Sequence, residues 1–157
     1  MRMRGWNVIP VMVVFLVLAG VAAVSAKYAL QAVPDLYAEA DLVCLAVVGE
    51  TAATGEEEGM VYQKTVLQVK KVFKGKEAGK AFDAGTRRYT TWMSDPSIQF
   101  PSPGTEVVVF LRAPKPDDGP YKTPWILANQ HQGIVVKGAS EITDWDGFLA
   151  DLSKGCK

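Results

Sequence analysis

The sequence predicts an all-β fold class, mainly β with one C-terminal helix, folded as a small closed barrel. Three features of the chain favour this prediction. Short apolar or alternating segments recur along it, several are separated by long proline-rich connections, and only the last segment has helical spacing. Five or so short strands of this kind are expected to close into a barrel, because closure removes the exposed sheet edges they would otherwise present.

Two uninterrupted apolar runs predict central strands. Leu42 to Val48 contains seven apolar residues, and Val107 to Leu111 contains five. Both runs are rich in valine and too short for a typical helix, which indicates strands buried on both faces.

The segment from Met60 to Lys74 alternates and predicts a strand with one buried face. The alternation slips at Lys70-Lys71, so we expect a β-bulge there, as in strands that bend around small barrels. Residues 51–59 before this strand are polar, and they are expected to form a loop or a hairpin tip. On the alternating strand, the residues expected to share one face are Val61, Thr65, Leu67 and Val69.

Weaker signals predict the remaining strands. Residues 81–83 and 86–93 are expected to be strand segments, with a break at Gly85. Residues 125–128 and 133–137 are expected to be the last two strands.

The C-terminal residues predict the one clear helix, at about 143–154. Thr143 or Asp144 can cap its start, and Gly155 ends it. Residues 27–40 are expected to be a lead-in with a helical turn after Pro34, and residues 41–157 to be the barrel domain. Helical i, i+3, i+4, i+7 spacing is shown by Trp145, Phe148, Leu149 and Leu152.

Residues 1–26 resemble a targeting segment. Arg2 and Arg4 precede an apolar stretch over residues 8–26, which ends in Val24-Ser25-Ala26. Small residues at this position are what signal peptidase needs, so we expect cleavage after Ala26 and export to the periplasm, cell envelope or extracellular space. The alternative is an uncleaved membrane anchor, since the apolar segment of 19 residues is just long enough to span a bilayer.

The charge balance excludes two classes of partner. Removing the segment with Arg2 and Arg4 leaves 15 basic and 17 acidic side chains. A near-neutral domain has no electrostatic footprint for nucleic acid or for an anionic membrane surface. Any contact with a membrane is therefore expected only through residues 8–26, if they are not removed.

Cys44 and Cys156 are the two cysteines, and export would place them in an oxidising compartment. A disulfide between them is a candidate, and it would close almost the whole domain. The alternative is that Cys44 is a small core residue inside its apolar run and Cys156 is a free thiol on a frayed C-terminal tail.

The residue types needed for catalysis are sparse, so we expect no enzyme, no metal and no cofactor. His131 is the single histidine, and no serine lies in a nucleophile-elbow context. The cysteines and this histidine have no zinc-ligand spacing. The acidic runs at 56–58 and 117–118 match no calcium loop, and they are expected to be solvated loop charge.

The most suggestive patch for ligand binding is Arg87, Arg88, Tyr89 and Trp92. Alternating basic and aromatic residues on a strand can hold an anion and stack on sugar rings or bases. The alternative is that Tyr89 and Trp92 lie on different faces and serve packing. For an exported protein, a glycan or a protein is the expected partner.

Several segments together resemble a known family. In order, they are ADLVCLAVVGE, VLQVKKVFKG, GTEVVVFL and QGIVV, followed by a terminal helix. This arrangement over about residues 40–152 is similar to exported bacterial proteins whose domain resembles tissue inhibitors of metalloproteinases and netrin-like modules. The resemblance implies an OB-like five-stranded barrel.

The inhibitory chemistry of that family does not carry over. Its members begin with a cysteine whose amine and carbonyl chelate the target's zinc, whereas the expected first residue here is Lys27 and the nearest cysteine is Cys44. An inhibitor would therefore need another geometry.

The sequence thus favours an exported, non-enzymatic binding or protein-interaction module of the cell envelope or extracellular space. A protease (metalloproteinase) inhibitor-like protein is the alternative. A further alternative is a carbohydrate-binding module using Trp92, Tyr89, Tyr121 or Trp125.

Overall fold

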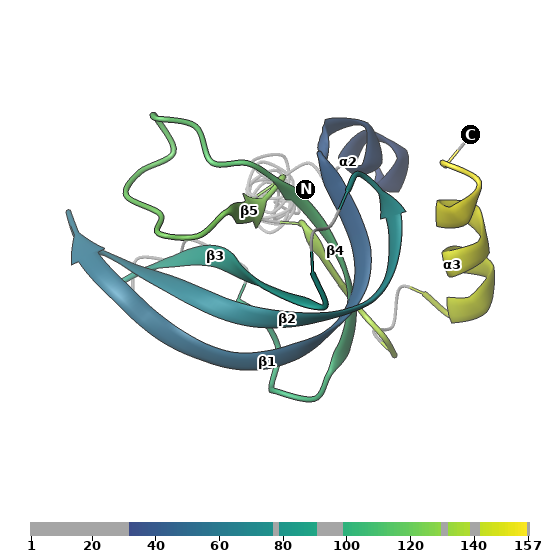
Figure 1. Ribbon diagram of the computed structural model, residues 1–157, viewed down its shortest axis with the longest axis horizontal. Helices are drawn as coiled ribbons and strands as arrows, with labels where there is room; N and C mark the ends of the chain where they lie inside the picture. Colours follow the sequence, from purple (N-terminus) through teal and green to yellow (C-terminus); the bar gives the residue numbers. More distant parts are fainter. Residues whose placement is uncertain (1–31, 77–78, 91–98, 130–131, 139–141, 157) are drawn as a thin grey trace, which may run out of the picture. The chain divides into compact units, whose positions relative to one another are not determined.

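A computed structural model describes residues 32–76, 79–90, 99–129, 132–138 and 142–156. Over these residues the chain is mainly β, with one six-stranded sheet and two helices (Figure 1). The elements are α2 (Val33–Glu39), β1 (Leu42–Glu57), β2 (Met60–Lys74), β3 (Ala81–Tyr89), β4 (Glu106–Arg112), β5 (Trp125–Leu127), β6 (Ile134–Val136) and α3 (Trp145–Ser153). The predicted targeting segment, residues 1–26, lies outside the described residues. In the described part of the chain, no helix is long and apolar enough to cross a membrane.

The strand pairings link five strands in a ring that is closed unevenly. β1 pairs with both β2 and β4, β2 continues to β3, and β5 pairs with both β3 and β4. The β1–β2 ladder is long, whereas β5 joins β3 and β4 at only two positions each. The β3–β5 pairing is parallel and the others are antiparallel, and β6 adds to β4 outside the ring.

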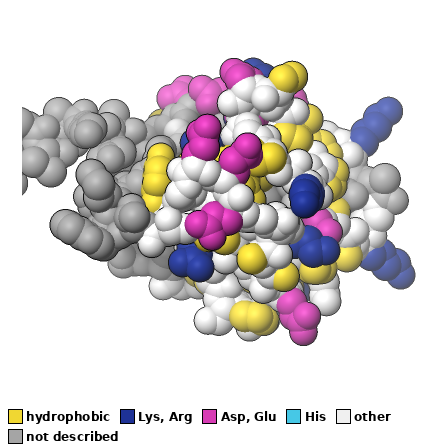
Figure 2. All heavy atoms as spheres, turned by 90° about the vertical axis from the view of Figure 1, so that its left-hand side faces the viewer, with side chains coloured by type: hydrophobic (Ala, Val, Ile, Leu, Met, Phe, Trp, Pro, Cys, Tyr) yellow, Lys and Arg dark blue, Asp and Glu magenta, His cyan; other side chains and the backbone are white. Residues whose placement is uncertain are grey.

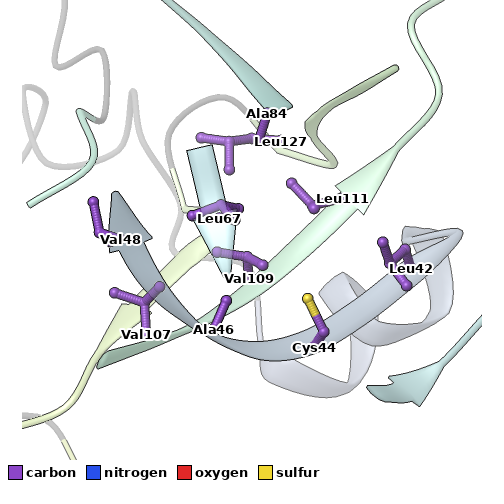
Figure 3. Packing of buried hydrophobic residues seen from close by; sticks show 10 residues of the cluster. All are labelled: Leu42, Cys44, Ala46, Val48, Leu67, Ala84, Val107, Val109, Leu111 and Leu127. Atoms are coloured by element: carbon purple, nitrogen blue, oxygen red, sulfur yellow. The ribbon is translucent and has the colours of Figure 1, made fainter. Parts of the chain in front are cut away.

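The apolar run of β1 is buried on both faces, as its sequence predicts. Leu42, Cys44 and Ala46 belong to the cluster enclosed by the ring, shown with its partners from β2, β3, β4 and β5 in Figure 3. Val43 and Leu45 face the other way, into a second cluster under the helices. A strand between two apolar layers needs no alternation, which is why the run is continuous.

The predicted bulge in β2 is confirmed at Lys70. Leu45 pairs with Lys71 and the next residue of β1, Ala46, pairs with Val69, so Lys70 is the extra residue. Beyond the bulge, Leu67 is fully buried and Thr65 lies on the same face. β4 is the second central strand, as predicted, with its five apolar residues buried.

Of the two alternatives predicted for residues 51–59, the hairpin tip is confirmed and the loop is wrong, because β1 continues as a strand to Glu57 and pairs with β2. The turn is only Glu58 and Gly59, whose φ angles are +50° and +76°. Two positive φ values define the tight hairpin turn that matches the twist of paired strands. Pairing with β2 therefore holds a polar stretch in strand conformation.

The predicted break at Gly85 is also wrong, because β3 runs through it without interruption. A Cβ on Gly85 would lie 2.5 Å from Thr123 Oγ1 and 2.7 Å from the Tyr121 ring. Glycine is thus needed here because the chain before β5 packs directly on the strand. The two last predicted strands are confirmed as β5 and β6, and β6 makes the sheet six-stranded beyond the expected five-stranded barrel.

Both helices pack on the second cluster through buried leucines, Leu36 from α2 and Leu152 from α3. α3 starts as predicted, because the Asp144 side chain accepts a hydrogen bond from the Gly147 N–H at 2.9 Å. α2 is anchored at its end by Lys74, whose Nζ donates to the Tyr37 carbonyl at 2.6 Å and to the Ala38 carbonyl at 3.0 Å.

No disulfide joins Cys44 and Cys156. Cys44 is fully buried in the cluster inside the ring, whereas Cys156 packs against the cluster under the helices. The two side chains therefore lie on opposite faces of β1, and a bridge would require Cys44 to change face. The structure agrees with the alternative prediction for Cys44, which is a core residue, whereas Cys156 packs against the second cluster and does not lie on a frayed tail.

Candidate functional site: the face at the end of the β1–β2 hairpin

Two open hollows of about 240 and 230 Å³ lie side by side where the β1–β2 hairpin meets the connection between β4 and β5. They share Glu57, Tyr62 and Pro120. The two hollows, together with the exposed Tyr89 at the rim of one of them, are termed the tip face. The residues that line the hollows are 54–58, 60, 62, 87, 117–120 and 122. The tip face brings together segments that are far apart in the sequence, and Figure 1 shows the two loops at the same end of the molecule.

A bidentate ion pair holds the β4–β5 connection in place. Arg112 Nη1 and Nη2 donate to the two carboxylate oxygens of Asp118, each at 2.6 Å. The side chains are only 19% and 11% exposed, and the Lys115 N–H also donates to Asp118. The hydrogen bonds from Arg112 lower the pKa of Asp118 to about 2, although burial opposes this shift. The connection is thus tied to the end of β4 rather than free in solvent.

Two tyrosines form the floor beneath this connection. Tyr62 and Tyr121 pack edge to face with ring centroids 5.0 Å apart, and burial raises the pKa of Tyr121 to about 12. Gly119 has a φ of +111°, and a Cβ there would lie 2.5 Å from the Tyr62 hydroxyl. Only glycine allows the chain to cross the ring so closely.

Arg87 is the member of the predicted patch that lies in the hollows. Its Nη1 donates to the Asp118 carbonyl at 3.3 Å, and it pairs across the sheet with Tyr62. Tyr89 shares the face of Arg87 by alternation, is 40% exposed, and pairs with Met60 at the rim of one hollow.

The rest of the predicted patch is divided. Arg88 is exposed, and alternation places it on the opposite face of β3 from Arg87. Trp92 and His131 lie outside the described residues. Arg87 and Tyr89 therefore form part of the site, and Arg88 does not.

Sequence reasoning missed the acidic character of the tip face. Glu56, Glu57, Glu58 and Asp117 were expected to be separate loop charges, but all line the two hollows. Figure 2 looks onto this end of the molecule and shows acidic side chains gathered over its upper and central part. Lys122 lies beside them, and its Nζ donates to the Thr54 carbonyl at 3.3 Å.

Tyr62 was also missed, because alternation placed it on the solvent face of β2. It is only 3% exposed, since the β4–β5 connection folds over it. An aromatic residue on the otherwise polar face of a strand was the available signal, but nothing local to β2 shows which loop covers it.

The aromatic residues proposed for sugar stacking are mostly used for packing. The Trp125 ring lies 6.4 Å from Phe82 and packs on the cluster inside the ring of strands. Tyr121 is held under the β4–β5 connection against Tyr62. Among the described members of that set, Tyr89 alone is exposed.

A further groove of about 350 Å³ lies between α2 and α3, lined by Val33, Pro34, Phe148, Asp151, Lys154 and Cys156. Its one reactive group is the Cys156 thiol, whose pKa is raised by burial and then by the Asp151 charge. A raised pKa makes a thiol less nucleophilic at neutral pH. In the described part of the chain, no group of three or more His, Cys, Asp or Glu side chains could hold a metal ion.

No protein-family model matches this chain, and no curated protein matches it.

Proposed function

We propose that this chain is an exported, non-enzymatic interaction module that binds a protein partner through the tip face. The observation that carries the proposal is the construction of that face. The Arg112–Asp118 ion pair holds the β4–β5 connection over the packed rings of Tyr62 and Tyr121. The result is a fixed, open surface rather than a deep pocket.

The size of the hollows supports a protein partner. Sites for small organic molecules are usually concave cavities of about 300–1,000 Å³. Each hollow alone, at about 240 or 230 Å³, is below this range, and both are open to solvent. Tyrosine and arginine are enriched at protein–protein interfaces, and Tyr89 and Arg87 are present here.

The ring of strands supports an OB-like barrel as the scaffold. OB folds are five-stranded, partly open barrels that bind ligands with the face of strands 2 and 3 and with the loops joining strands 1–2 and 4–5. The uneven ring of β1 to β5 fits this description. The tip face is formed by the corresponding parts, namely the β1–β2 turn, the β2–β3 face and the β4–β5 connection.

The two alternative functions have less support. Zinc chelation by an N-terminal cysteine is the chemistry of the resembling inhibitors, and the expected N-terminal residue here is Lys27. Sugar binding would need exposed rings, and Tyr121 and Trp125 are used in packing. A protein interface therefore remains the proposal that the geometry supports best.

A pull-down with the full chain as bait, from the envelope and culture fluid of its own host, tests the proposal. The expected result is one protein partner captured in stoichiometric amount. Polysaccharide without protein would contradict the proposal and favour the carbohydrate-binding alternative. Turnover of ester, peptide or glycoside substrates that a point substitution abolishes would show that the chain is an enzyme.

A further inference from the structure

We infer that the partner contributes an extended segment rich in lysine or arginine, which pairs as an added strand with the outer edge of β1 from Thr51 to Glu57. This stretch is termed the free edge. The inference rests on the proposed function, since the free edge runs along the hairpin that carries the tip face.

The free edge has a neighbouring strand on one side only. β1 pairs with β2 as far as Glu57, but its pairing with β4 ends at Val47. The next residue, Val48, is still covered, because its N–H donates to the Thr105 carbonyl at 2.9 Å and its carbonyl accepts from the Gly104 N–H at 2.7 Å.

Beyond Val48, no other strand pairs with this side of β1 within the described residues, although the Thr54 carbonyl accepts a hydrogen bond from Lys122 Nζ at 3.3 Å. Figure 1 shows the second half of β1 with β2 along one side and no strand along the other. Unpaired N–H and C=O groups in a row form a template for another strand. At about 3.3 Å per residue the seven residues span about 23 Å, enough for a typical strand of five or six residues.

The side chains of the free edge leave room for a strand to approach. Ala52, Ala53 and Gly55 are small and exposed. A Cβ on Gly55 would meet no atom within 4 Å, so no packing contact in the fold requires a glycine there. Glycine within a strand often marks a bulge or a place where another backbone comes close. The register does shift between Ala53 and Gly55, so the bulge is present and the surrounding space is still open.

Charge selects the kind of strand. Glu50, Glu56, Glu57 and Glu58 lie along or at the end of this segment, all exposed. None of them forms an ion pair with the described lysines and arginines. Like charges placed opposite each other destabilise a sheet pair, so the glutamates disfavour a second copy of the same edge. Lysine or arginine on the incoming strand would instead complement them.

Main-chain pairing provides the affinity in such complexes, and side chains provide selectivity. An edge without a neighbouring strand, together with glutamates that form no ion pair with the described lysines and arginines, therefore predicts an extended basic segment. The same two features disfavour both an acidic strand and self-association of the chain.

The test uses the full chain and a blocked hexapeptide, acetyl-Lys-Val-Lys-Val-Lys-Val-amide. Amide hydrogen exchange is measured by NMR with and without the peptide. At 90% occupancy we expect about tenfold slower exchange for those amides of residues 51–57 that face outward, since they exchange from the free fraction. The amides of β4 are expected to be unchanged.

Two peptide controls separate strand pairing from simple charge attraction. A peptide of the same sequence with N-methyl groups on alternate residues keeps its charge but loses the donors on one edge. Two such peptides, one for each edge, are tested. At least one is expected to give no protection of residues 51–57. Acetyl-Glu-Val-Glu-Val-Glu-Val-amide is expected not to bind.

A protein variant tests whether the glutamates of the free edge select a basic strand. Glu56→Lys/Glu57→Lys is expected to weaken binding of the lysine peptide at least tenfold, whereas the exposed Glu39→Lys on α2 is expected to leave it unchanged. Thermal melting of both variants confirms that each is folded.

The inference is overturned if the lysine peptide gives no protection of residues 51–57 at millimolar concentration, or if both N-methylated peptides protect as well as the parent. Its failure is distinguishable from failure of the proposed function. If the host partner binds equally to wild type and Glu56→Lys/Glu57→Lys but loses affinity for Arg87→Ala, the tip face keeps its function and the edge inference is wrong. If no partner is captured at all, the proposed function is wrong.

Discussion

Replacing Asp118 by asparagine tests how the tip face is held in shape. Asp118→Asn removes the charge that Arg112 binds through two 2.6 Å hydrogen bonds. The pKa of this carboxyl falls from 3.8 to about 2 in the folded chain, mainly through those bonds. Each pKa unit corresponds to about 1.4 kcal/mol, so the ionised group stabilises the folded state by about 2 kcal/mol.

The direction of the pH dependence follows from the lowered pKa. The stabilisation is fully present above the unfolded pKa of about 4, and it is lost as the pH falls through about 2. Urea denaturation of wild type and Asp118→Asn is measured at pH 7, 5, 3 and 2. We expect a difference of about 2 kcal/mol at pH 7 and 5, and only a small part of it at pH 2.

The neighbouring exposed residue provides the control. Asp117→Asn is expected to cost less than about 0.5 kcal/mol, as is usual for surface substitutions. An Asp118→Asn cost that is equal at pH 2 and pH 7 would refute the ion-pair reasoning, because it would then come from packing.

Three further predictions concern the core, the cysteines and the surface charges. Leu67→Ala is expected to lower the free energy of unfolding by about 2–4 kcal/mol because Leu67 is fully buried. Val72→Ala, at a partly exposed site, should cost less than about 1 kcal/mol, and equal costs would contradict the assigned faces of β2. Alkylation in denaturant without reductant should modify both Cys44 and Cys156, and native alkylation should spare the buried Cys44; an unmodified pair in denaturant would reveal a disulfide. Glu106→Gln should lower the free energy of unfolding by at most about 1 kcal/mol near neutral pH, because the two lysine partners of Glu106 are half exposed. This loss should shrink in acid as the pH approaches the lowered Glu106 pKa of about 2, and a loss independent of pH and salt would contradict this account.

The sequence predicted well those parts of the fold in which a local residue pattern is compatible with only one local structure. Leu42 to Val48 had to be buried on both faces because no residue in the run is polar. The slipped alternation at Lys70 could be accommodated only by an extra residue in the strand, and the bulge is there. Asp144 caps α3 as its position before the helical spacing indicates.

The parts that sequence did not predict depend on contacts between distant residues. Residues 51–57 carry no strand pattern, and they become strand because β2 pairs with them. Gly85 resembles a break, but its missing side chain makes room for Tyr121 and Thr123. These are tertiary effects that override local preference.

The same limit applies to the site. Arg87 was singled out by its neighbours in sequence, but its position in the hollows depends on Asp118 and Tyr62, which come from other strands and loops. The acidic runs at 56–58 and 117–118 were visible in the sequence as separate loops. These acidic runs come together only because the β1–β2 and β4–β5 connections meet at one end of the molecule.

Titration of the host partner against Arg87→Ala and Arg88→Ala tests the central claim, binding through the tip face, most directly. The two residues are adjacent on β3, but Arg87 lines a hollow and Arg88 lies on the opposite face. The account predicts at least about tenfold weaker binding for Arg87→Ala, the loss of about 1.4 kcal/mol, and unchanged binding for Arg88→Ala. Equal affinities for the two variants, or a larger loss for Arg88→Ala, would show that the partner binds elsewhere.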